Sequence, residues 1–346
     1  MNIVTGERPI RQACAHCGGE LVFSPEKMAL ACQSCGSIFA IDGDPHPAEK
    51  TALEHSQRAV RTHWGIHTKQ LTCTSCGAQR VENELQLAGK CPYCGSHYVL
   101  ESSAEDLLPP DGVVPFSVSR EQAQQKLRLW LGQKPLAPAG LRKKDFTQKF
   151  TGSYIPCWTF DAQTTTRYRG RYGIRRGGKI YWSACTGTYS AFVNDVLTDA
   201  GKSRGKEQNR LIQEIQPFAT EENLQYDARY LLGFSAQRYQ RGLADSWLRA
   251  KNMLSRELAR RTEQHVKDKY GASMVQIDAV TVYQNVTYKY LLLPVWMLAF
   301  PYMGSMYLIA VNGQTGKISG RTPAAAEKVG IIAAVVLLVI LLLFLL

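Results

Sequence analysis

Eight of the ten cysteines form four Cys-x-x-Cys pairs, and a glycine follows each pair. Thiolates at this spacing bind tetrahedral zinc, because a tight turn brings two sulfur atoms to one ion and glycine lets the backbone curl around it. Fourteen residues separate the first pair from the second and the third from the fourth. We therefore predict two Zn²⁺ sites, one held by Cys14, Cys17, Cys32 and Cys35 and the other by Cys73, Cys76, Cys91 and Cys94.

Both predicted ions have a structural role. A closed shell of four thiolates leaves no position for a substrate or an activated water. His16 and His97 lie in or beside the cysteine pairs, and either could replace one cysteine. Metal-binding cysteines indicate a reducing compartment, and the first residues lack the apolar stretch of a signal peptide. We expect the N-terminal body to lie in the cytoplasm.

Each zinc site requires a ribbon, in which a β-hairpin brings two cysteine turns together. In the first ribbon, residues 21–23 and 28–31 are the predicted strands, around a turn at 24–27. The predicted domains are ribbon 1 at 1–45, a helical linker at 46–66, ribbon 2 at 67–100, a linker at 101–115, α+β modules at 116–222 and 223–328, and a membrane span at 329–346.

The predicted body is α+β. Ser119, with glutamine three residues later, is typical of a capping box, and the helix after it should end at Gly132. A second helix is predicted from about Ala236 to Lys269 on an apolar stripe. A hairpin turning at Asn312 is expected near the end of the body.

The body also suggests a duplication. The stretch "PFSVSREQAQQKLRLWL" is similar to "GFSAQRYQRGLADSWL", which matches Trp130 to Trp247 within one residue. A Pro-x-Trp phrase follows in each half. We therefore predict two copies of a helix-plus-hairpin module, with a fold analogy to the PepSY domain for the last hairpin.

Residues 329–346 contain no charged or polar side chain. As a helix this segment would be about 27 Å long, close to the roughly 30 Å of a bilayer's hydrocarbon core. A buried core helix is the alternative, although such a helix usually keeps a polar face. Lys317, Arg321 and Lys328 precede the segment, and the positive-inside bias then keeps the body cytoplasmic. The sequence predicts a single-pass, tail-anchored protein of a bacterial inner membrane.

A basic strand is the most suggestive candidate surface. Alternation in "TTTRYRGRYGIRRGGKIYW" places arginines on one face and tyrosines on the other. An edge strand kept soluble by arginine, a contact with anionic lipid, and a nucleic-acid surface are all compatible with this pattern and with the net charge of +12. The candidate surface for an anionic partner comprises Arg167, Arg169, Arg171, Arg175, Arg176 and Lys179.

No catalytic grouping is predicted. "DAGKS", which begins at Asp199, has Val196 where a phosphate-binding loop requires its first glycine. Cys157 and Cys185 lie outside the cysteine pairs, without a His, Asp or Glu constellation to activate them. We expect Cys157 to be a small core residue, and we expect no enzyme and no small-molecule substrate.

Several phrases resemble a family of bacterial zinc-ribbon membrane proteins of the TFIIB type, also described as primosomal protein N-prime or helicase-like. They are "GVVPFSVSREQA", "YIPCWTFDAQTTTRYRG", "YDARYLLGFSAQRYQ", "LLLPVWMLAFPYMGSMYLIAVNGQTGKISG" and the second ribbon, within residues 65–323. For some relatives the resemblance implies a link to envelope stress, through recruitment of phage-shock protein A. The helicase label lacks support, because the sequence supplies no nucleotide cradle.

Two function hypotheses follow. The leading one is a non-enzymatic, membrane-anchored zinc-ribbon adaptor that presents a cytoplasmic body to a protein partner, for which the resemblance implies a phage-shock system. The alternative is a membrane-tethered nucleic-acid-binding protein with a role in replication or transcription.

Overall fold

The computed structural model describes residues 14–19, 21–41, 46–54, 68–73, 79–83, 99–102, 110–201, 205–236, 239 and 241–325. Three ligands of the second predicted zinc site, Cys76, Cys91 and Cys94, lie outside these residues, as does His97. The predicted membrane span at 329–346 also lies outside them.

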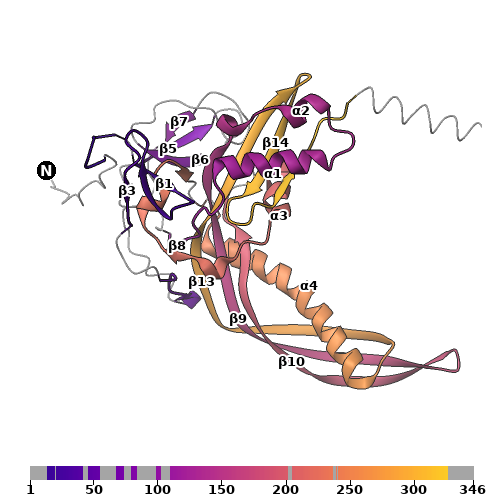
Figure 1. Ribbon diagram of the computed structural model, residues 1–346. Coiled ribbons are helices and arrows are strands. Elements are labelled where there is room, and N and C mark those ends of the chain that lie inside the picture. Colours follow the sequence, from indigo (N-terminus) through magenta and orange to yellow (C-terminus); the bar gives the residue numbers. More distant parts are fainter. Residues whose placement is uncertain are drawn as a thin grey trace, which may run out of the picture.

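Four strands form the centre of the molecule (Figure 1). They are β9 (Thr151–Arg176), β10 (Lys179–Asp199), β13 (Met274–Tyr302) and β14 (Ser305–Asn312), in the order β10–β9–β13–β14 with antiparallel neighbours. With shorter strands they make a 12-stranded sheet among the described residues. The shorter strands are β4 (Thr51–Ala52), β5 (Thr68–Cys73), β6 (Gln79–Asn83), β7 (Val99–Ser102), β8 (Gly112–Val113), β11 (Leu224–Gln225), β12 (Ser235–Ala236) and β15 (Ile318–Gly320).

The predicted fold class, an α+β body of two small modules with a C-terminal membrane helix, is wrong, because the described chain is mainly β. A helix followed by a hairpin does occur twice, as α1 (Arg120–Gly132) before β9 and β10, and as α4 (Leu243–Tyr270) before β13 and β14. However, β9 and β13 pair with each other along most of their length. Both hairpins therefore belong to one sheet, and neither is a separate module.

No helix in the described part of the chain is long and apolar enough to cross a membrane. This finding overturns, for those residues, the expectation of a single-pass inner-membrane protein with the membrane as a partner. The two longest described helices, α1 and α4, carry charged residues along their length. Many of the charged side chains of α4 are exposed to solvent. Each packs one face against protein and leaves the opposite face polar, as helices of globular domains do.

The helices follow their local signals. The predicted capping box is present in α1, since Ser119 accepts a hydrogen bond from the Gln122 backbone and the Gln122 side chain accepts one from the Ser119 N–H. The second predicted helix begins later than expected, because Ser235 and Ala236 form β12 and Gly242 is the N-cap of α4. The remaining helices are α2 (Ala139–Lys143), α3 (Gly205–Glu214) and the 3-10 turns Thr147–Lys149, Thr220–Glu222 and Ala228–Leu231.

The predicted connecting helix at 46–66 is wrong where the structure describes it. Thr51 and Ala52 form β4, which pairs with Thr287 and Tyr288 of β13. The helical composition of this stretch is outweighed by the backbone hydrogen bonds that the edge of β13 offers. Residues 55–67 lie outside the described part.

The core is aromatic where the two halves meet. Phe116, before α1, stacks on Phe234, before α4, with ring centroids 4.3 Å apart. Tyr154 packs edge-on against Phe116, and Trp296 packs edge-on against Phe234. Gly152 makes room for this cluster, because a Cβ atom there would lie 2.4 Å from the Phe234 ring. Buried aromatic pairs of this kind contribute strongly to stability.

The predicted match between the two tryptophans is wrong. Trp130 lies in the last turn of α1, where the Lys134 ammonium lies over its ring. Trp247 lies near the start of α4 and packs on Phe160 of β9, with ring centroids 5.3 Å apart. The two residues therefore occupy unrelated positions in their helices.

We predict that Ser119→Ala lowers the free energy of unfolding by about 1 kcal/mol, because the Gln122 N–H in the first turn of α1 loses its side-chain acceptor. Urea unfolding followed by circular dichroism measures the change. Ser117→Ala, at an exposed serine two residues earlier, is the matched control. Equal stability of the Ser119 variant and wild type would contradict the role of the cap.

Candidate metal centre and basic arm

The first ribbon folds as a three-stranded sheet of β1 (Leu21–Ser24), β2 (Ala29–Cys32) and β3 (Ile38–Phe39). The predicted hairpin is confirmed, although its second strand starts one residue later than expected. Met28 belongs to the turn, where it adopts a left-handed φ of 46°. The hairpin and the two cysteine turns converge on one point.

At that point the structure brings the four thiols of Cys14, Cys17, Cys32 and Cys35 together, with all sulfur atoms within 4.8 Å of one another. The Cys14 and Cys35 sulfurs lie 3.6 Å apart, and those of Cys17 and Cys32 lie 3.5 Å apart. A tetrahedral ion with metal–sulfur bonds of about 2.3 Å needs sulfur separations of roughly 3.8 Å. The cluster is therefore the right size to bind one metal ion.

The backbone supports the cluster with N–H donors. The N–H groups of His16, Gly19 and Ser34 each point at a cysteine sulfur at 3.4 Å. Donors of this kind stabilise thiolates and orient metal ligands. The ring of His16 is engaged elsewhere, because its Nδ1 lies 2.9 Å from the Ser37 hydroxyl. Of the described candidates, cysteines alone form the ligand set.

The thiols do not ionise alike. The hydrogen bond from the Ser37 hydroxyl lowers the pKa of Cys35 to about 6. The Gly19 N–H lowers the pKa of Cys17, but hydrogen bonds with the Cys35 and Cys32 thiols outweigh it and raise that pKa to about 12. A cluster that holds part of its negative charge in this way releases its remaining protons when a cation binds.

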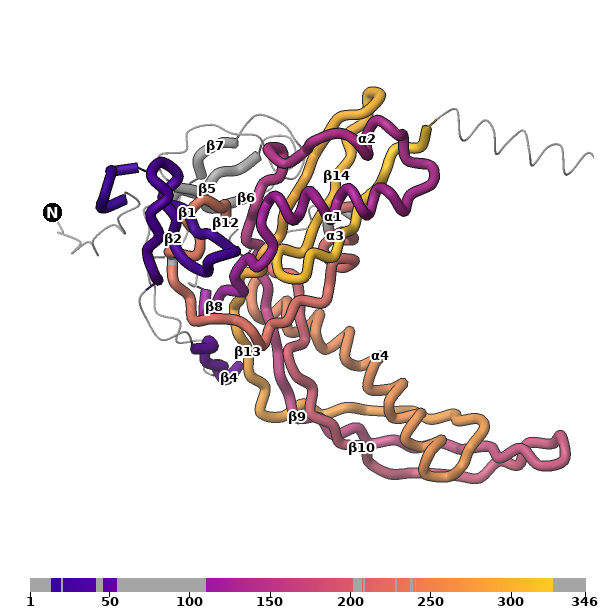
Figure 2. Tube along the Cα trace, viewed as in Figure 1, coloured from indigo at the N-terminus to yellow at the C-terminus, as the bar shows by residue number. Residues whose placement is uncertain are grey.

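The ribbon is docked on the body. The Phe23 N–H donates to the Leu232 carbonyl at 2.9 Å, and the Phe23 ring packs edge-on against Tyr230 with centroids 5.2 Å apart. Gly233, with a left-handed φ of 86°, leaves room for Val22, because a Cβ atom would lie 2.9 Å from that side chain. Figure 2 shows the indigo ribbon beside this segment. Metal site and body therefore share one hydrophobic cluster.

The distal halves of β9, β10 and β13 project from the body as an arm, with α4 along one face (Figures 1 and 2). We call the uncovered opposite face the outer face. Arg167, Arg169 and Arg171 are exposed there, and Tyr168 is buried on the face toward α4. Gly177 and Gly178 turn the chain at the tip, between Arg175 and Arg176 on one side and Lys179 on the other.

The outer face mixes cationic and apolar side chains. The strand register places Val280 opposite Arg167, Asp278 opposite Arg169 and Gln276 opposite Arg171. Arg171 donates to the Gln276 side chain at 2.8 Å, and its guanidinium lies 4.7 Å from the centroid of the Trp182 ring. We consider residues 163–173 of β9 and the described residues that pair with them in β10 and β13. Among these, Asp278 is the one residue with a carboxylate. The face is therefore open and positively charged.

The arm bends away from the body at an elbow, formed by one bulge in each strand beside β9. In β10 the two bulged residues are Asn194 and Asp195, which lie opposite the single residue Asp161 of β9. In β13 they are Asn285 and Val286, opposite Ala162. Asp195 and Asn285 adopt left-handed φ values of 48° and 50°, a conformation that occurs in one class of β-bulge.

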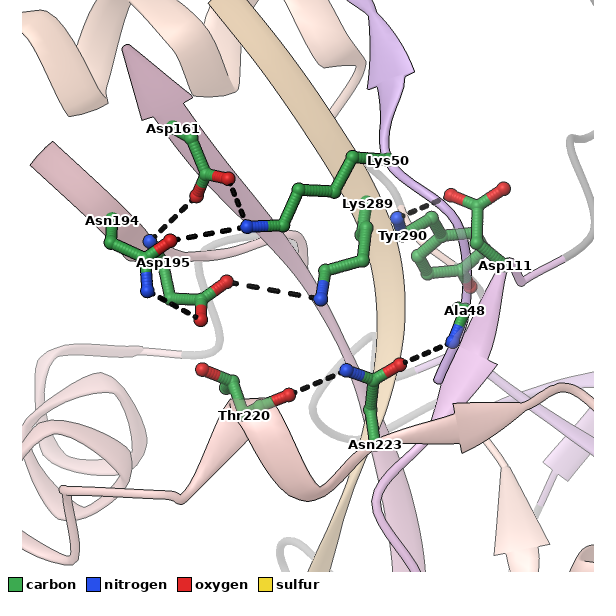
Figure 3. A network of polar contacts seen from close by, with 10 residues as sticks. All are labelled: Ala48, Lys50, Asp111, Asp161, Asn194, Asp195, Thr220, Asn223, Lys289 and Tyr290. Carbon is green, nitrogen blue, oxygen red and sulfur yellow. Dashed lines mark hydrogen bonds and ion pairs between the residues drawn. The ribbon is translucent and has the colours of Figure 1, made fainter. Parts of the chain in front are cut away.

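Two buried charged residues, Asp161 and Lys289, stabilise the elbow together with more exposed partners (Figure 3). Lys50 forms an ion pair with Asp161 and donates to the Asn194 side chain at 3.1 Å. The second carboxylate oxygen of Asp161 accepts a hydrogen bond from the Asp195 N–H at 2.8 Å. Lys289 is 4% exposed, and its ammonium lies 3.9 Å from the Asp195 carboxylate. A buried charge that loses its partner strongly destabilises the folded chain. This network therefore stabilises the bend.

Neighbouring polar groups tie other segments to the same region. The Asn223 side chain accepts from the Ala48 N–H at 2.9 Å and donates to the Thr220 carbonyl at 2.6 Å. Asp111 accepts a hydrogen bond from the Tyr290 N–H at 2.6 Å. Desolvation by burial raises the pKa of Asp111 to about 6, despite this hydrogen bond and the nearby Lys289, which both lower it.

Sequence reasoning missed the elbow. Two charged residues inside apolar runs could have indicated it. They are Asp161 in "CWTFDA" and Lys289 in "YKYLLLPVW". A charge in a strand that is buried on both faces must have a partner. The identity of that partner depends on the strand pairing, which the sequence does not state. Cys157, by contrast, is a buried core residue as predicted.

The chain is 29% identical over 331 residues to the uncharacterized protein YdjG of Bacillus subtilis (strain 168), which covers 92% of each chain. No family model matches the chain. No solved structure matches it either. The function is therefore inferred from the fold and from the geometry of the site.

We predict that the free energy of unfolding falls as pH rises from about 4 to about 6, by roughly 2 kcal/mol from Asp111. The pKa of Asp111 is raised on folding, so the folded chain binds this proton more tightly than the unfolded chain, and deprotonation favours unfolding. Asp111→Asn keeps the acceptor for Tyr290 and should remove this component. The exposed Asp278→Asn is the control, and identical pH profiles for Asp111→Asn and wild type would contradict the assignment.

Proposed function

We propose that this protein is a non-enzymatic adaptor, in which a zinc ribbon is docked on a β body whose arm binds an acidic protein partner. The observation that carries the proposal is the outer face of the arm. It presents Arg167, Arg169 and Arg171 beside exposed apolar side chains, and the described residues leave it uncovered. An open patch that combines arginine with apolar surface is typical of protein interfaces.

Zinc is the metal proposed for the four-cysteine cluster. The sulfur separations support it, since they approach those of a tetrahedral thiolate site, and so does the ligand type, since soft thiolates favour zinc over harder cations. The same spacing in the second set of cysteines supports a second structural ion. Because a shell of four thiolates leaves no open coordination position, both ions are proposed to stabilise the fold.

The partner class rests on charge. An acidic protein surface complements the arginines, and aromatic or aliphatic side chains among its carboxylates would meet Val280 and Phe192, which are 70% and 61% exposed. The family resemblance adds phage-shock protein A as one candidate partner. Phage-shock protein A is therefore the first named protein to test as a partner.

Crosslinking in cells that express the tagged chain, followed by immunoprecipitation and mass spectrometry, tests the adaptor. The triple change Arg167→Ala, Arg169→Ala and Arg171→Ala should reduce recovery of a specific protein by at least about tenfold, because charge complementarity is lost at the contact. The matched control removes the same charge from exposed arginines of α4, with Arg249→Ala, Arg256→Ala and Arg260→Ala. If no recovered protein distinguishes the two triple variants, the proposed surface is wrong.

The same variants test nucleic-acid binding, the second candidate. It is favoured by the pairing of Arg171 with Trp182 and by the net charge of +12. Here single-stranded DNA should bind with a steep salt dependence, and the arm variant should reduce the slope by about two while the α4 control keeps it. Weak binding that is the same in both variants would remove this candidate.

A metal analysis tests the zinc assignment. We predict two zinc ions per purified chain by plasma mass spectrometry, and one in Cys32→Ser. That variant should also unfold at a lower temperature, since ribbon 1 shares a hydrophobic cluster with the body. Cys185→Ser, at a buried thiol outside the cluster, should keep both ions. Unchanged zinc content in Cys32→Ser would contradict the site.

A further inference from the structure

In the arm, one edge of β13 is open. From Met274 to Gln284 this strand pairs with β9 on one side. Its other side has no strand partner among the described residues, since β4 begins to pair only at Thr287. At about 3.3 Å per residue the open edge is roughly 35 Å long. It therefore presents a row of backbone N–H and C=O groups to any extended chain that approaches.

This edge lacks the features that keep natural sheet edges from pairing. Edge strands are commonly protected by lysine, proline, bulges or a short length. The sequence "MVQIDAVTVYQ" contains no lysine, proline or glycine, and Asp278 is its one charge. The bulge at Asn285 and Val286 lies just beyond the open segment and ends it. An unprotected edge of this length is suited to pairing.

A groove runs beside the edge, on the face toward α4. Its volume is about 280 Å³, near the small end of ligand pockets. The floor is formed by every second residue of β13, Ala279, Thr281 and Tyr283. The wall is formed by one flank of α4, including Leu248, Asn252 and Ser255. A helix flank beside an open strand is the arrangement in which peptide-binding domains accept an added strand.

An added strand would find apolar partners on both of its faces. Its side chains toward α4 would meet Leu248, which is 54% exposed. Those toward the outer face would meet Val280 and Val282, which are 70% and 49% exposed. Because side chains alternate between the faces of a strand, a peptide with apolar residues at successive positions would cover all three.

The groove also sets a charge preference. Lys251 is the one charged residue among its lining side chains. Its ammonium lies 5.8 Å from the centroid of the Trp247 ring, and the ion pairs between described residues of α4 involve Arg260 and Arg261 instead. A carboxylate on the incoming chain would complement Lys251, as it would the arginines of the adjoining outer face.

We infer that the open edge of β13 accepts an extended segment of a protein partner, and that this segment is rich in β-branched and acidic residues. The segment pairs with residues 274–284 beside the flank of α4. This inference rests on the proposed adaptor function and names how the partner is held. Backbone pairing gives the affinity, and contacts at Leu248, Val280 and Lys251 select the segment.

A phage-displayed library of random peptides of about twelve residues, panned on the immobilised full chain, supplies the probe. We expect enriched peptides rich in Val, Ile, Thr and aromatic residues, with Asp or Glu among them. The best peptide, made synthetically, should slow amide hydrogen exchange in residues 274–284. Enrichment without such protection, or protection confined to another segment, would overturn the inference.

Two further measurements separate backbone pairing from simple hydrophobic contact. N-methylation of the peptide should weaken binding by about a hundredfold at alternate residues and little at those between, because every second amide faces β13. Leu248→Glu should weaken binding by about tenfold, whereas Leu129→Glu, at an exposed leucine of α1, should not. The methylation scan needs no protein variant, so it decides the matter even if Leu248→Glu folds poorly. A scan without alternation would overturn the inference.

The outcomes separate this inference from the adaptor function. If the arginine variant loses a partner in cells while no peptide protects β13, the adaptor stands and the strand site falls. If neither is seen, both fall. Self-association of the pure chain, with exchange protection of residues 274–284 that depends on concentration, would identify the occupant as a second copy and overturn the partner segment.

Discussion

The antiparallel pairing of β9 with β13 is the contact on which the rest of the structure depends. It joins residues more than one hundred positions apart, from Thr151 with Met297 at one end to Gly173 with Met274 at the other. Near the body both strands are buried on both faces and read as continuous apolar runs. In the arm the same strands alternate exposed residues with buried residues in β9 and half-buried residues in β13, because α4 covers one face. One strand pair therefore supplies both the core and the exposed surface.

The ribbon depends on this pair through a short connecting segment. Residues 230–236 contact Phe23 of the ribbon and then run beside β9 as β12. Ala236 also pairs with Val81 of β6, in the region of the second predicted ribbon. A metal-binding segment attached in this way adds its binding free energy to the stability of the body. That coupling distinguishes this ribbon from one carried on a flexible linker.

The features that the sequence predicted are local ones. Four cysteines within 22 residues, the capping box at Ser119 and the alternation around Arg169 each express short-range chemistry, and each is found as a local structure. The features that it did not predict are long-range. Thr51 and Ala52 became a strand because β13 lies beside them, and Lys50 and Asp161 met because strand pairing brought them together.

The prediction of the fold class was wrong for the same reason, namely that strand pairing is long-range. Helix caps and turns mark where elements begin and end, but they do not state which strands become neighbours. Two predicted hairpins became one continuous sheet through β9 and β13. The membrane expectation rested on composition at 329–346, outside the residues that the structure describes.

The elbow has a mechanical consequence. The strands on both sides of β9 carry their extra residue at the same level, opposite Asp161 and Ala162. To straighten the arm, β10 and β13 would each have to shift their register against β9 by one residue. Such a shift turns every later side chain to the opposite face of the sheet. Exposed residues such as Val280 would then enter the space under α4. The direction of the arm is therefore set by the number of residues in each strand, and this residue count also sets its orientation relative to the four-cysteine cluster.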